Sequence, residues 1–219
     1  FAQAQNGDPV AKRHTYTNFI KAAPDSLIRA WDIKKYGNLI PPYPSDIYNV
    51  YNINRALAVD VAIPDIDQWN KSISNMLKIL GPQRQANVVV VFTKLDQSYL
   101  QAIEGKWLGG KKNDIVVVIG TSQYPQIDWV GVASWTPQEL FKVQLRDSIV
   151  AVGVVDRDKI INQIQAHTLA TFKRREMKDF EYLQYQIEPP KWALILAIIS
   201  GIVTSLGLSY FFYHNDLRR

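Results

Sequence analysis

The chain has 219 residues, of which 47% are hydrophobic, with a formal net charge of +5 and no cysteine. This length allows one globular domain with a sizeable core and additional segments. The composition excludes collagen-like, disulfide-stapled and wholly disordered chains, and the lack of cysteine excludes thiol catalysis and Cys-ligated metal centres. The mild positive charge forms no basic stripe, so we expect no nucleic-acid partner.

Residues 1–60 form an N-terminal extension rich in Tyr, Asn and Pro. The pattern predicts a short helix over residues 25–36, closed by Gly37 at the C′ position. Prolines exclude helix from residues 40–54 and discourage central strands, so we expect an irregular segment that packs on the domain or forms an interaction surface. Residues 56–63 have the pattern of a strand.

Residues 61–188 have the pattern of an α/β domain. Pro64 fits the first turn of an amphipathic helix that runs to about Leu80 and ends at Gly81-Pro82. Unbroken aliphatic runs predict strands that are buried on both faces, and Asp96 is placed to cap the helix between the first two. The predicted strands are 88–93, 115–120 and 127–135.

Two helices complete the predicted domain. Residues 136–139 have the sequence of a capping box with proline at N1, which predicts a helix that continues to about Ile149. Asp156 is predicted to cap a longer helix, whose inward side chains extend through Phe172 to Phe180. This order of elements predicts an α/β sandwich in which a short mixed sheet lies between helices.

Residues 189–219 contain the clearest feature, a run of 22 uncharged residues from Trp192 to Tyr213. As a helix, this run is about 33 Å long, which is enough to cross a hydrocarbon core of about 30 Å. Trp192 at one end and Tyr210 and Tyr213 at the other have the positions of membrane-interface anchors. The sequence therefore predicts one C-terminal transmembrane helix, over about 192–213, followed by a short basic tail.

Small residues recur every fourth position along this span, at Ala197, Gly201, Ser205 and Ser209. They share one face of a helix, where a second helix backbone can approach closely. We therefore expect partners among other transmembrane subunits, as well as the lipid bilayer itself.

The flanks of the span predict its orientation. Arg218 and Arg219 follow it closely, whereas Lys191 is the basic residue immediately before it. The positive-inside bias therefore places the C-terminus in the cytoplasm and the domain on the periplasmic or lumenal side. The first residues, Phe1 and Ala2-Gln3-Ala4, fit a processed signal-peptidase site and equally an arbitrary chain boundary.

Two groups of residues together resemble the TPM domain family. One is the segment from Lys106 to Asp114, with Trp107, Gly109 and Lys111, followed by an aliphatic strand; the other is Asp156, Ile160-Ile161, Phe172 and Asp179-Phe180. The resemblance covers roughly residues 65–184 and implies a TPM-like α/β/α sandwich followed by a single span. The family includes photosystem II repair and assembly factors and bacterial envelope proteins. Some members are described as acid phosphatases, and some as binding divalent metal such as calcium.

The sequence departs from the family pattern where that chemistry would lie. A glycine-rich loop is expected after the third strand, but residues 134–139 read SWTPQE. Asp114 and Asp156 are the remaining candidate metal ligands, and they would need further oxygens nearby to hold calcium. Asp156 is also expected to be an N-cap, and Asp114 to start a strand. We expect no cofactor, and calcium is the ion that the resemblance leaves open.

These observations favour a non-catalytic accessory or assembly subunit of a larger membrane complex, photosynthetic or respiratory. No phosphate loop or nucleophile–base arrangement is present in the sequence. The first alternative is a metal-dependent acid phosphatase of the TPM type. The second is an envelope quality-control protein that binds polypeptide through a sheet edge.

Overall fold

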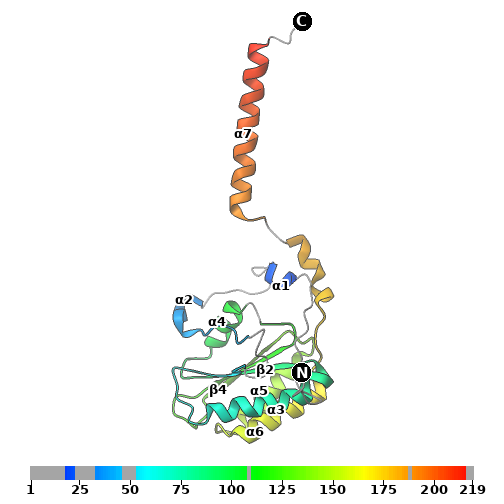
Figure 1. The fold of residues 1–219 in the computed structure, drawn as a ribbon. Helices are drawn as coiled ribbons and strands as arrows, with labels where there is room; N and C mark the ends of the chain where they lie inside the picture. The colour runs from blue at the N-terminus through cyan, green and yellow to red at the C-terminus, as the bar shows by residue number, and fades with distance from the viewer. Residues whose placement is uncertain (1–17, 23–32, 46–52, 108–109, 187–188, 216–219) are drawn as a thin grey trace, which may run out of the picture.

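The computed structural model describes residues 18–22, 33–45, 53–107, 110–186 and 189–215, and shows an α/β domain followed by one long helix (Figure 1). The sheet contains β1 (Ala56–Val59), β2 (Asn87–Thr93), β3 (Asp114–Gly120) and β4 (Trp129–Ser134). The α-helices are α1 (Phe19–Ala22), α2 (Ile33–Tyr36), α3 (Ile66–Arg84), α4 (Tyr99–Lys106), α5 (Glu139–Val150), α6 (Arg157–Thr171) and α7 (Lys191–His214). The 3₁₀ helices within the described residues are η2 (Gly37–Leu39) and η4 (Met177–Gln186).

The four strands form one mixed sheet in the order β1-β2-β3-β4. β1, β2 and β3 are parallel, and β4 runs antiparallel to β3. This confirms the expected α/β class and the short mixed sheet. β1, which precedes residue 61, is an edge strand of this sheet.

Both faces of β2 and β3 are buried, which explains their unbroken aliphatic sequences. Val88, Val90 and Phe92 face one core, together with side chains of α3, α5 and α6. Val89 and Val91 face a second core with α4 and with Tyr36 and Ile40 of the extension. Helices therefore cover both faces of the sheet, with α4 on the side nearer to α7 (Figure 1).

The two crossover connections have opposite handedness. β1, β2 and β3 step across the sheet in one direction, but α3 crosses on one face and α4 on the other. Parallel crossovers are right-handed in about 98% of cases. One of these two must therefore be left-handed, a feature that no local sequence pattern indicates.

Several predicted boundaries were wrong for local reasons. β1 ends at Val59 because Asp60 has a left-handed φ of 56°. α3 passes through Gly81-Pro82 and ends at Arg84, where Gln85 adopts the left-handed conformation with a φ of 52°. Residues 127 and 128 precede β4 rather than starting it. Of the helix predicted over 25–36, residues 25–32 lie outside the described residues.

The two final helices of the domain also differ from their predictions. The capping box does not form: the Thr136 hydroxyl accepts from Gln138 N at 3.3 Å, and α5 starts only at Glu139. Asp156 does cap α6, accepting from Lys159 N at 3.0 Å. However, α6 ends at Thr171, and Phe180 lies in the separate helix η4.

Candidate functional site

The most buried charged side chain of the domain is Asp114, at the amino end of β3. It is completely shielded from solvent, yet both carboxylate oxygens have donors. Oδ2 accepts from Tyr43 Oη at 2.8 Å and from Lys111 N at 2.6 Å, and Oδ1 accepts from Asn87 Nδ2 at 2.9 Å. Arg55 extends the network by donating from Nε to Asn87 Oδ1 at 2.9 Å.

This network joins the amino ends of three neighbouring strands. Arg55 precedes β1, Asn87 starts β2 and Asp114 starts β3. Burial raises the pKa of the Asp114 carboxyl, and its three hydrogen bonds oppose that shift. Burial and the charge of Asp114 also raise the pKa of Tyr43, so its hydroxyl remains a donor at neutral pH. Burial lowers the pKa of Arg55, although a guanidinium stays protonated in proteins.

The network holds the proline-rich segment of the extension against the domain. Besides the bond from Tyr43, Trp107 Nε1 donates to Pro41 O at 2.8 Å, and the Tyr43 and Trp107 rings meet edge to face at 5.4 Å. Gly110 has a φ of +71°, and a Cβ there would lie 2.7 Å from Asp114 Oδ2. Trp107, Gly110 and Lys111 therefore help to attach the proline-rich segment to the domain.

Asp156, the second candidate metal ligand, lies at the other end of the sheet. Val155 N donates to Pro125 O at 2.6 Å, and Pro125 follows the carboxyl end of β3. The seven residues of β3 separate the two ends by about 20 Å. Asp114 and Asp156, the two candidate metal ligands, are therefore too far apart to bind one ion together. Among the residues that the structure describes, no three His, Asp or Glu side chains are grouped for a metal.

A second polar cluster lies at the carboxyl end of β2. Tyr36 Oη donates to Asp96 Oδ1 at 2.7 Å, and Lys35 Nζ donates to Asp96 Oδ2 at 2.8 Å and to Ser98 Oγ at 3.0 Å. The hydrogen bond from Lys35 lowers the pKa of Asp96, and the same bond raises the pKa of Lys35. A protonated lysine cannot act as a base for Ser98, so the cluster attaches α2 to the start of α4.

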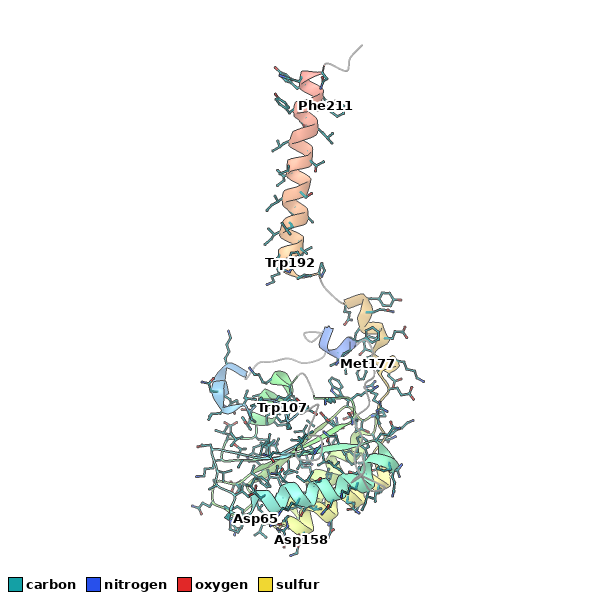
Figure 2. All side chains as sticks on the ribbon, in the orientation of Figure 1. Asp65, Trp107, Asp158, Met177, Trp192 and Phe211 are labelled. Carbon is teal, nitrogen blue, oxygen red and sulfur yellow. The ribbon has the colours of Figure 1, made fainter. Side chains whose placement is uncertain are left out.

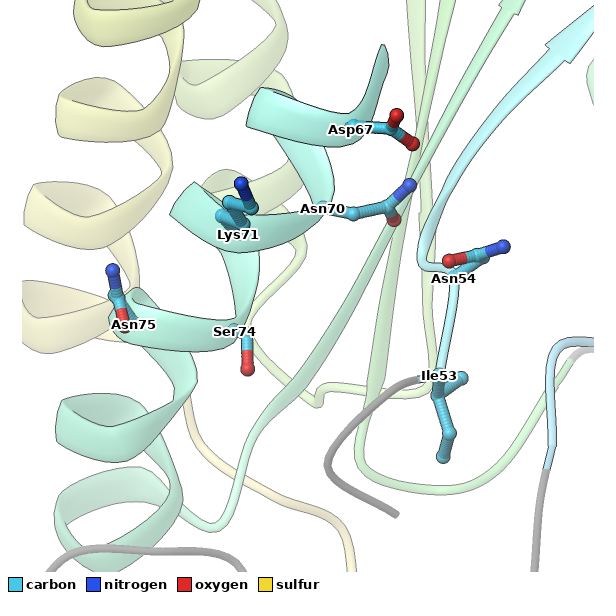
Figure 3. A pocket seen from close by; sticks show the side chains of 7 residues that line it. All are labelled: Ile53, Asn54, Asp67, Asn70, Lys71, Ser74 and Asn75. Atoms are coloured by element: carbon cyan, nitrogen blue, oxygen red, sulfur yellow. The ribbon is translucent and has the colours of Figure 1, made fainter. Parts of the chain in front are cut away.

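A polar pocket of about 480 Å³ lies between α3 and the residues that lead into β1 (Figure 3). Its walls combine amide, hydroxyl and charged side chains: Ile53, Asn54, Asp67, Asn70, Lys71, Ser74 and Asn75. Asn70 Oδ1 accepts from both Arg55 N at 2.7 Å and Ala56 N at 2.8 Å. The Asn70 amide, which lines the pocket, thus already accepts hydrogen bonds from the backbone at the start of β1, the edge strand of the sheet.

The C-terminal helix α7 matches the predicted span and extends it slightly. Its 24 residues include none that are buried, and Trp192 and Phe211 mark its two ends in Figure 2. The predicted anchors Trp192, Tyr210 and Tyr213 are exposed by 65%, 65% and 84%. This is the one helix among the described residues that is long and apolar enough to cross a membrane. Arg218 and Arg219 lie outside the described residues.

The predicted packing face of α7 contacts no other part of the domain. Ala197, Gly201, Ser205 and Ser209 are all exposed, and a Cβ at Gly201 would meet nothing within 4 Å. Close to this face, the Thr204 hydroxyl donates within the helix, from Oγ1 to Ser200 O at 2.8 Å. Because no residue of α7 is buried on any side, the role of these four residues as a packing face stays a prediction.

Sequence reasoning missed the partners of Asp114. Tyr43, Asn87 and Arg55 were not singled out, because each stands in a segment assigned to a loop or to the end of a strand. The available signal was a polar residue immediately before or at the start of each of three successive strands. No family model matches the chain, and neither does any curated protein or any solved structure.

Proposed function

We propose that this protein is a non-catalytic accessory or assembly subunit of a larger membrane complex, photosynthetic or respiratory. In this proposal a single span holds the α/β domain at the membrane surface. The observation that carries it is α7, which buries no residue and has no charge from Trp192 to Tyr213. A protein dissolved in water rarely exposes an apolar surface of that size.

The energetics of α7 favour insertion into lipid. Eleven of its side chains are Leu, Ile, Val or Phe. On an insertion scale each contributes about 0.3 to 0.6 kcal/mol, so together they favour the membrane by about 3 to 7 kcal/mol before smaller costs. The helix is about 36 Å long, against a hydrocarbon core of about 30 Å.

The engagement of the polar side chains supports a non-catalytic role. Asp114 holds the proline-rich segment, Asp156 caps α6, and Asp96 anchors α2. Each of these carboxylates thus has a structural partner at hydrogen-bond distance. A metal-dependent phosphatase built on Asp114 and Asp156 gains no support, because the two lie at opposite ends of β3.

The small-residue face of α7 supports a partner helix, because small side chains let two backbones approach closely. We expect Gly201→Leu to reduce co-purification of membrane partners from gently solubilised native membranes. Val203→Leu is the matched control, since at about 100° per residue Val203 lies on the opposite face. Equal co-purification of both variants, or a lone monomer in the wild type, would refute the subunit proposal.

Two finer expectations belong to the same proposal. The placement of the domain on the periplasmic or lumenal side is supported by the arginines that follow the span. Because the chain has no cysteine, labelling of an Asn75→Cys variant with a membrane-impermeant maleimide in intact cells or sealed membranes tests this sidedness. The TPM-like character of the domain is supported by the order of its elements and by the segment that leads into Asp114.

A second candidate function is the binding of polypeptide at the sheet edge. β1 pairs with β2 on one side, and the polar pocket lies along its other side. Arg55 O accepts from Val90 N at 2.8 Å, so by alternation Ala58 directs its N–H to the open edge. We expect Ala58→Pro, which an edge strand tolerates, to abolish binding of an unfolded model polypeptide. Unchanged binding by the folded variant would refute this function.

A further inference from the structure

The helix η4 links the domain to α7 and has three distinct faces. A 3₁₀ helix has three residues per turn, so every third side chain lies on the same face. Phe180 and Leu183 share the face that is buried, at 1% and 0% exposure. They pack with Ile20 of α1 and with Trp135, whose ring meets Phe180 edge to face at 5.3 Å. η4 is therefore attached to the domain rather than free in the linker.

A second face of η4 carries two exposed aromatic side chains. Tyr182 is 51% exposed and Tyr185 is 85% exposed, one turn apart. Four residues separate the end of η4 at Gln186 from the start of α7 at Lys191, a span of at most about 18 Å. Tyrosine has an apolar ring and a polar tip, and it is enriched at the boundary between lipid and water.

Charge contributes little to this surface. Residues 173–186 contain four basic side chains against three acidic ones. Two of the basic groups are already paired, Lys178 with Glu176 at 2.8 Å and Arg175 with Asp179 at 3.9 Å. A polybasic segment would depend strongly on anionic lipid, but a nearly neutral one with exposed tyrosines would not.

We propose that Tyr182 and Tyr185 lie in the headgroup layer of the bilayer that α7 spans. η4 then forms a second membrane contact beside the span. Because Phe180 and Leu183 attach η4 to the domain, this contact fixes which side of the domain faces the lipid. The inference rests on the proposed function, in that α7 must cross the membrane.

The absence of cysteine allows single-site labelling of the full chain in phosphatidylcholine nanodiscs. A fluorophore is attached at Gln186→Cys, at Ile199→Cys in the middle of α7, or at Asn75→Cys on the distant helix α3 (Figure 1). Quenching is measured with a nitroxide on the lipid headgroup, with a nitroxide deep in the acyl chain, and with aqueous iodide. We expect the headgroup nitroxide to quench the label at 186 several-fold more strongly than the label at 75.

A matched pair of variants tests the tyrosines themselves. Replacing Tyr182 and Tyr185 with serine should return the label at 186 to the quenching seen at 75, whereas replacing both with tryptophan should preserve the membrane signal. Adding phosphatidylglycerol or salt should change neither result, because the charges nearly balance.

The outcomes separate this inference from the proposed span. If the acyl-chain nitroxide quenches the label at 199 but the label at 186 is as accessible to iodide as the label at 75, the inference is wrong and the span stands. If the label at 186 is protected from iodide only in native membranes, the tyrosines contact a protein partner and the inference is also wrong. If iodide quenches the label at 199, the span itself is wrong and the inference falls with it.

Discussion

Tyr43→Phe isolates one hydrogen bond of the buried network. The substitution keeps the ring, and with it the contact with Trp107 at 5.4 Å, but removes the hydroxyl that donates to Asp114 at 2.8 Å. Asp114 is inaccessible to water, so no solvent molecule replaces the lost donor. A hydrogen bond to a buried charged group contributes about 1.5 to 3 kcal/mol, and we expect the unfolding free energy to fall by that amount.

Urea unfolding of the full chain in detergent micelles, followed by tryptophan fluorescence, measures this change. With a slope of about 1 to 3 kcal/mol per molar urea, the midpoint should fall by about 1 M. Tyr182→Phe is the control, because that ring is half-exposed and far from Asp114 in the sequence. An unchanged midpoint in Tyr43→Phe would show that the proline-rich segment does not depend on Asp114, which would refute the structural role of this network.

Three further predictions address the domain. Gly120→Ala should destabilise it by about 1 to 3 kcal/mol, because the new Cβ would lie 2.0 Å from the Trp129 indole. Gly81→Ala should instead stabilise it by up to about 1 kcal/mol, because Gly81 lies within α3 and a Cβ there meets open space. Urea unfolding measures both changes. Burial raises the pKa of Asp114 above 3.8, so the folded state holds this proton more tightly than the unfolded state does. The unfolding free energy should therefore decrease as the pH rises from that value. Asp114→Asn should reduce this dependence on pH in unfolding curves recorded between pH 4 and 7. Asp156→Ala should lower the thermal midpoint by several degrees, and Asp156→Ser should restore most of it; an equal loss in both would exclude a capping role.

The buried network and the packing around η4 suggest how the extension contributes to the protein. Tyr36, Ile40 and Tyr43 attach the extension to the face of the sheet that carries α4. Ile20 attaches it to η4, which leads into α7. The extension thus contacts both the sheet and the helix that precedes α7. Loss of the Tyr43 bond is therefore expected to weaken the domain without altering α7, which makes no contact with this network.

Features that depend on local composition could be predicted from the sequence. The two buried strands followed from unbroken aliphatic runs, since a strand covered on both faces needs apolar side chains at every position. The end-to-end apolar character of α7 followed in the same way. The cap of α6 by Asp156 was also predictable, because the bond from Lys159 N joins residues only three apart.

Features that join distant parts of the chain were decided only by the tertiary structure. The bond between Tyr43 and Asp114 connects residues 71 positions apart, and no local pattern indicates it. The opposite handedness of the two crossovers depends on which face of the sheet each helix covers. The apolar side of α3 or α4 could pack against either face, so the sequence does not indicate which one it covers. The separation of Asp114 from Asp156 depends on the direction of β3, because residues that look equivalent in the sequence can stand at opposite ends of a sheet.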